Sequence, residues 1–76
     1  FNSDVNLAFV LGSSDNVTIK IYDLSGKLID LLMDNAFMPE GETKVEYHAS
    51  HLARGLYIAE IVTSTQKERI KISAIE

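Results

Sequence analysis

The stretch from Asn16 to Leu32, NVTIKIYDLSGKLIDLL, constrains the fold more than any other part of the chain. In its first half, apolar residues at every second position predict a strand with one buried face. Asp23-Leu24-Ser25-Gly26 then supplies turn chemistry, because an Asp side chain can bond the following backbone and a Gly accepts a positive φ. An apolar segment from Lys27 to Met33 returns. The stretch therefore predicts a β-hairpin whose turn depends on Asp23 and Gly26.

Length, charge and composition limit the classes of protein that the chain can belong to. With 76 residues, 46% of them hydrophobic, residues 1–76 are expected to form a single domain. The absence of cysteine excludes disulfides and thiolate metal sites. A net charge of −4 has the wrong sign for a nucleic-acid binder. No apolar run approaches the roughly 20 residues of a membrane span. Because the chain opens without Met, we expect a domain of a longer protein.

Three further segments show the alternation of strands. They are residues 4–11, 43–48 and 66–75, and their apolar positions are expected to form one core with the hairpin. The expected core residues are Val5, Leu7, Phe9, Ile19, Ile21, Val45, Ile70 and Ile72. The segment Leu56–Thr63 is apolar on both faces except for Glu60, which must reach solvent or pair with a Lys or Arg. Short strands separated by turns predict an all-β, antiparallel sandwich of about six to seven strands.

The connections between these strands carry their own expectations. Asp34 to Gly41 is expected to be a loop, with Gly41 at the next turn. Phe37 and Met38 in that loop are expected to close one end of the core, the alternative being an exposed apolar patch. Ser50 to Arg54 is expected to form one helical turn that ends at Gly55.

The last segment separates apolar from basic residues. Ile70, Ile72 and Ala74 share one face, and the other face carries Lys67, Arg69, Lys71 and Ser73. Two interpretations stay open. The charges could protect an open sheet edge from aggregation, or they could be a signal that a partner reads.

No group of residues indicates catalysis or a cofactor. His48 and His51 are three residues apart, but no third metal ligand stands near them. Ser50 between them lacks the GxSxG context of a nucleophile. The carboxylates are scattered, and each glycine stands alone at a turn, so no phosphate-binding loop is present. We therefore expect neither an enzyme nor a metal or cofactor site.

The order of these features resembles the C-terminal sorting domain of the type IX (Por) secretion system of Bacteroidetes. The resemblance covers nearly the whole chain and rests on Val17, Ile19, Ile21, Tyr22, Asp23, Gly26, Ile29, Pro39, Gly41, Leu52, Gly55 and Tyr57. Lys67 and Lys71 match the family's K-x-x-x-K spacing. The chain departs from the pattern at Tyr47, where a Trp is common, at His48, where an acidic residue is usual, and at its acidic end.

The resemblance implies an immunoglobulin-like sandwich at the C-terminus of a secreted or cell-surface cargo protein that travels through the periplasm. It implies two partners besides the upstream cargo domain: the outer-membrane translocon and a sortase-like peptidase. The surface expected to be recognised combines the last strand with the corner that follows residue 54. Its residues are Lys67, Arg69, Lys71, Gly55 and Tyr57. For each of these a purely structural role is the competing interpretation.

A second function comes from another class of protein. The hairpin motif also occurs in structural Ig-like spacers and in accessory modules of secreted enzymes, some of which bind carbohydrate. Carbohydrate binding requires a platform of exposed aromatic side chains, and within the predicted strands only Tyr22 is expected on a solvent face. The spacer is therefore the stronger form of this alternative.

Overall fold

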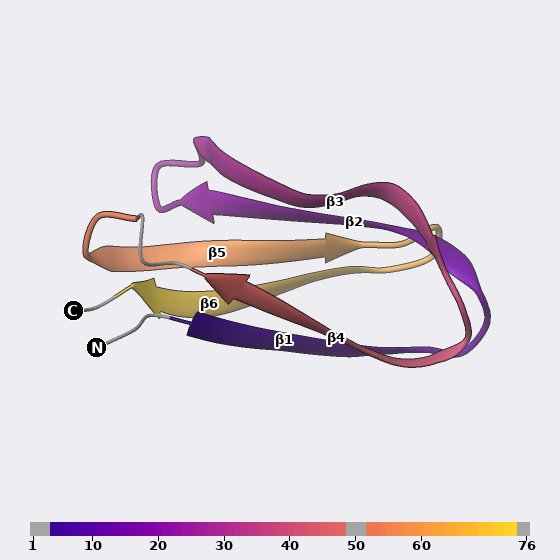
Figure 1. The fold of residues 1–76 in the computed structure, drawn as a ribbon. Helices are drawn as coiled ribbons and strands as arrows, with labels where there is room; N and C mark the ends of the chain where they lie inside the picture. Colours follow the sequence, from indigo (N-terminus) through magenta and orange to yellow (C-terminus); the bar gives the residue numbers. More distant parts are fainter. Residues whose placement is uncertain (1–3, 49–51, 75–76) are drawn as a thin grey trace.

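The computed structural model describes residues 4–48 and 52–74, and all their regular structure is β. Six antiparallel strands form two sheets, one of two strands in the order β1-β4 and one of four in the order β3-β2-β5-β6 (Figure 1). The strands are β1 (Asp4–Leu11), β2 (Asp15–Asp23), β3 (Leu28–Met38), β4 (Gly41–His48), β5 (Gly55–Val62) and β6 (Lys67–Ala74). The prediction of an antiparallel β-sandwich of six to seven strands is confirmed. Within the described residues, no helix has the length and hydrophobicity that a membrane crossing requires.

The core lies between the two sheets and uses the faces that alternation predicted. Val17, Ile19 and Ile21 of β2 are fully buried. The other buried apolar residues are Leu7, Phe9, Leu11, Tyr47, Tyr57, Ala59, Ile61 and Ile72, and the half-buried Val5, Val45 and Ile70 pack against them. All eight residues expected in the core therefore belong to it or pack on it.

The hairpin turn is built as its residues predicted. The Asp23 carboxylate accepts hydrogen bonds from the backbone N–H groups of Ser25 and Lys27, at 2.9 and 3.0 Å, and from the Ser25 hydroxyl at 2.7 Å. These bonds lower the pKa of Asp23, the Ser25 hydroxyl having the largest effect. Gly26 has a φ of +91°, which a side chain would strain. The turn therefore fixes how the end of β2 is joined to the start of β3.

The prediction of a loop from Asp34 to Gly41 is wrong for residues 34–38, because β3 continues to Met38. Residues Asp15 to Val17 pair with Met38 to Ala36, so the start of β2 supplies the partner that holds this segment extended. Asn35, at a φ of 54°, accommodates an irregularity in the pairing, and its N–H donates to the Thr18 hydroxyl at 3.0 Å.

Two smaller expectations also change. Phe37 is 70% exposed and closes nothing, because its position opposite Asn16 points it away from the core. Met38 does pack against the core.

Of the predicted helical turn, Ser50 and His51 lie outside the described residues, and residues 52–54 form no helix. One isolated turn makes too few hydrogen bonds to persist, and Leu52 instead packs on the core. Gly41, with a φ of +113°, begins β4.

Candidate partner-recognition surface

The predicted basic residues lie together on one side of an edge strand. β6 ends the four-stranded sheet, and its register places Lys67 opposite Val62, Arg69 opposite Glu60 and Lys71 opposite Ile58. Residues directly opposite one another in an antiparallel pair point to the same face of the sheet. Tyr57, Ala59 and Ile61 of β5 face the core, so the three basic residues lie on the outer face. All three are exposed.

The neighbouring strands extend this arrangement into rows across the sheet. β2 pairs with β5 so that Thr18, Lys20 and Tyr22 stand opposite Val62, Glu60 and Ile58. Lys20 therefore belongs to the same surface, a residue that the sequence did not single out. We call Lys20, Lys67, Arg69 and Lys71 the basic face; it holds four of the chain's seven Lys and Arg residues. The alternation in β2 predicts that Lys20 faces solvent, but only the register of β2, β5 and β6 shows that it shares a face with the basic residues of β6.

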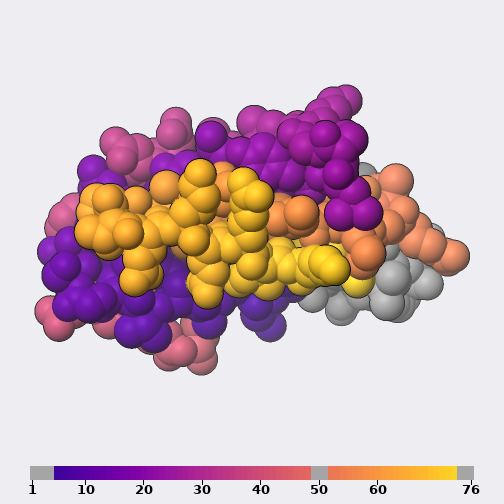
Figure 2. All heavy atoms as spheres, turned by 180° about the vertical axis from the view of Figure 1, so that it is seen from behind, coloured from indigo at the N-terminus to yellow at the C-terminus, as the bar shows by residue number. Residues whose placement is uncertain are grey.

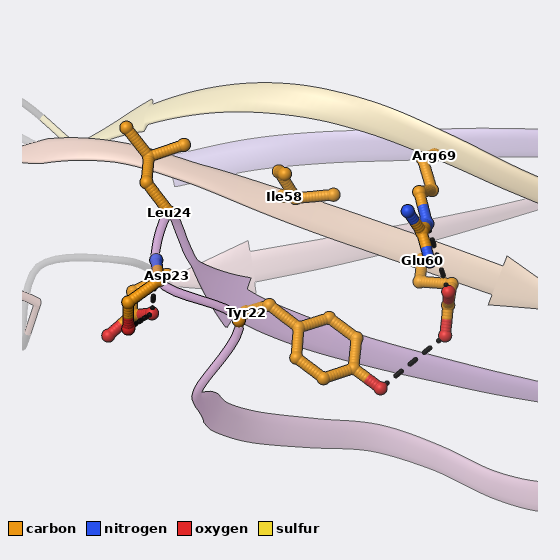
Figure 3. Close-up of a pocket in the computed structure, with 8 residues that line it drawn as sticks. Tyr22, Asp23, Leu24, Ile58, Glu60 and Arg69 are labelled. Carbon is orange, nitrogen blue, oxygen red and sulfur yellow. Dashed lines mark hydrogen bonds and ion pairs between the residues drawn. The ribbon is translucent and has the colours of Figure 1, made fainter.

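Glu60 is the one carboxylate among the directly paired outer-face residues of β2, β5 and β6, and it is only 6% exposed. The Arg69 Nε donates to Glu60 Oε2 at 3.1 Å, and the Tyr22 hydroxyl donates to Oε1 at 3.4 Å (Figure 3). Of the two alternatives that the sequence left for Glu60, solvent or a Lys or Arg partner, the structure shows the partner. Arg69 thus has a structural partner, although its side chain remains 64% exposed. Substituting Lys67 or Lys71 therefore tests recognition without breaking the ion pair of Arg69 with Glu60.

A shallow hollow of about 410 Å³ opens on the outer face beside this ion pair. Figure 3 shows Leu24 of the hairpin turn and Ile58 of β5 on one side of it, with Tyr22 and Glu60 on the other. Its lining is about half polar, and the polar groups already have partners: Glu60 is paired with Arg69, and Asp23 accepts from the Ser25 hydroxyl. That arrangement fits a partner's side chain.

Gly55 and Tyr57 have a different position from the basic residues. Tyr57 is 8% exposed on the core face, and its hydroxyl donates to the backbone carbonyl of Ala53 at 2.6 Å. A Tyr that bonds backbone a few residues upstream is a known corner device of β-sandwiches. Gly55 has a φ of +154° and pairs with Ala74 at the end of β6. The structure therefore places both residues at the start of β5, where they hold a corner beside β6.

Other candidate chemistry does not assemble in the part of the chain that the structure describes. No group of three or more potential metal ligands occurs there. His48 lies 3.6 Å from the Glu46 carboxylate on an exposed surface, while His51 lies outside the described residues. Among aromatic side chains in residues 4–48 and 52–74, only Phe37 is largely exposed, so no aromatic platform for carbohydrate is present.

The fold and the basic face define a small β-sandwich module whose distinctive feature is a surface. The family described as the secretion system C-terminal sorting domain matches residues 1–75, and the chain belongs to that family. Comparison with curated proteins and with solved structures finds no match. The resemblance to type IX sorting domains is thereby confirmed. The chain is a sorting signal domain for type IX secretion, from a family of non-catalytic signal domains whose cargo is secreted or displayed at the cell surface.

Proposed function

We propose that this domain is the C-terminal tag of a longer cargo protein and that the outer-membrane translocon binds it after the cargo has entered the periplasm. A sortase-like peptidase then separates the tag from its cargo. The domain itself performs no chemistry in this scheme. Membership of the sorting-domain family supports the scheme, and the described residues add no metal cluster that would suggest another.

The basic face is the part of the tag proposed to meet the machinery, and one observation carries this assignment. Lys67, Arg69 and Lys71 occupy alternate positions of an edge strand in a chain whose net charge is −4. Concentrating cations on one face of an acidic domain gives it an orientation toward an acidic partner. Gly55 and Tyr57 support recognition by fixing the corner at the start of β5, beside the end of β6.

Charge reversal on β6 is expected to reduce export. A signal peptide and a fluorescent protein are joined to Phe1–Glu76, and fluorescence in the medium is compared with that in the periplasm of a type IX-competent bacterium. Lys67→Glu with Lys71→Glu is expected to lower export about tenfold or more, because like-charge contact replaces attraction.

The matched control is Lys27→Glu with Lys44→Glu, which makes the same change in net charge at exposed positions outside the basic face. This control is expected to export within about twofold of the parent, since isolated surface charges contribute little. Equal losses for the two double variants would contradict recognition through β6. Protease resistance of the periplasmic fraction verifies that each variant is folded.

A further inference from the structure

β6 ends the four-stranded sheet, and within the described residues one of its two edges has no partner strand. Its other edge pairs with β5 over eight consecutive positions, from Gly55 opposite Ala74 to Val62 opposite Lys67, without a register shift. An edge strand presents a row of backbone N–H and C=O groups that can pair with an incoming extended segment. An incoming segment can follow a strand whose backbone is continuous and free of bulges.

The opposite edge of the same sheet is less suitable. β3 pairs with β2 through three register shifts, and Asn35 of β3 has a positive φ. Irregularities of this kind bend and twist an edge and interrupt pairing. Of the two edge strands of the four-stranded sheet, β6 is therefore the better suited to pair with an added strand.

The two sides of the β6 edge differ in chemistry. The outer side carries Lys67, Arg69 and Lys71, and the side toward the core carries Ile70 and Ile72, with the exposed Glu68 at one end. Figure 2 shows β6, in yellow and orange, exposed along the face seen from behind, with the indigo residues of β1 beside it.

A hollow of about 320 Å³ lies between the β6 end of the sheet and β1. Phe9 and Leu11 of β1 form the apolar part of its lining together with Ile61 of β5. Thr63, Gln66 and Glu68 form the polar part. Ile70 beside it is only half-buried. In an added strand, every second side chain would point toward the core and cover Phe9, Leu11 and Ile70. The side chains between them would lie beside the basic residues.

We propose that β6 binds its partner by strand addition and that the partner segment alternates acidic with apolar residues. The acidic side chains stand beside Lys67, Arg69 and Lys71, and the apolar ones cover Ile70 and the hollow. This inference rests on the proposed function and names the chemistry of the partner that the sorting tag meets.

The same charges explain why a second copy of β6 is a poor occupant. Two β6 edges brought together would oppose Lys and Arg with Lys and Arg, which charged edge strands use to prevent self-association. An acidic strand converts each of those repulsions into a favourable cross-strand pair. The charges of the β6 edge thus disfavour pairing with a second β6 and favour pairing with an acidic strand.

The test is binding of a synthetic peptide that repeats Glu-Val to the domain Phe1–Glu76, followed by NMR. The peptide is expected to shift the backbone signals of β6, and Lys67→Glu with Lys71→Glu is expected to weaken binding about tenfold. The control Lys27→Glu with Lys44→Glu is expected to bind within about twofold of the parent. A Glu-Val peptide with methylated backbone nitrogens is expected to bind more weakly, because strand addition needs its N–H groups.

Three results would overturn strand addition. They are no binding of the Glu-Val peptide, equal binding of the methylated peptide, and signal shifts centred on β3 instead of β6. Each is separable from failure of the proposed function. If the peptide fails while export of the fusion still depends on Lys67 and Lys71, the tag recognises its partner by another geometry. If the parent fusion is not exported, the proposed function fails whatever the peptide does.

Discussion

Ile21→Ala is expected to lower the free energy of unfolding of the domain by about 2–5 kcal/mol. Ile21 is fully buried on β2, a central strand, and it pairs with Ala59 of β5 and Asp30 of β3. Its removal from the middle of the core leaves a cavity that strands held on both sides cannot close. Urea unfolding followed by circular dichroism measures the change.

Leu24→Ala is the matched control for Ile21→Ala, because it removes an aliphatic side chain of equal size from the same hairpin. Leu24 is 62% exposed, so its loss is expected to cost no more than about 0.5 kcal/mol. Ile21→Val, expected to cost about 0.5–1.5 kcal/mol, gives a second reading if the alanine variant does not fold. A cost for Ile21→Ala well under about 1 kcal/mol would show that β2 presents its other face to the core.

Tyr47→Ala is expected to have a comparable effect, about 3–5 kcal/mol, for a reason that involves both sheets. Tyr47 of β4 is 4% exposed, and its hydroxyl donates to Asp30 Oδ2 of β3 at 2.9 Å. The side chain therefore fills the core and also ties the two-stranded sheet to the edge of the four-stranded one. Tyr47→Phe keeps the ring and is expected to cost about 1.5–3 kcal/mol through the lost bond to a carboxylate.

The Tyr47 hydroxyl also predicts a pH dependence. Burial, and then the Asp30 carboxylate, raise the pKa of Tyr47 above its usual value. A raised pKa means that the fold favours the neutral phenol, so this stabilisation is complete below about pH 10, the ordinary pKa of Tyr, and declines above it. The parent is expected to lose more stability in alkali than Tyr47→Phe does. Lys44→Ala on the same strand is the neutral control, and equal stability of Tyr47→Phe and the parent would contradict the bond.

The strands and the core could be predicted because their signal is local. Val17, Ile19 and Ile21 share a parity, and burial on one face is what a period of two encodes. The end of β3 could not be predicted in this way. Asp34 and Asn35 suggest a loop by composition, and only the pairing of residues 36–38 with the start of β2 keeps the segment extended. Phe37 was misplaced for the same reason, because its exposure follows from that register.

In the candidate surface too, features of a single strand could be predicted, and features that depend on pairing between strands could not. Alternation within the last strand was enough to predict that Lys67, Arg69 and Lys71 share one face. For Glu60 the sequence predicted two alternatives, contact with solvent or a Lys or Arg partner, because a carboxylate is costly to bury alone. The structure shows the second. Which cation pairs with Glu60, and the addition of Lys20 to the basic face, depend on the register among β2, β5 and β6. Register between strands distant in sequence is not encoded in any one of them.

The most direct test of sorting is export of the parent fusion, in which Phe1–Glu76 follows a signal peptide and a fluorescent protein. The fusion is produced in a type IX-competent bacterium and in a strain that lacks the outer-membrane translocon. We expect fluorescence at the cell surface or in the medium of the competent strain and folded fusion retained in the periplasm of the deficient one. Retention of the folded fusion in the periplasm of both strains would contradict a sorting function and leave a structural module.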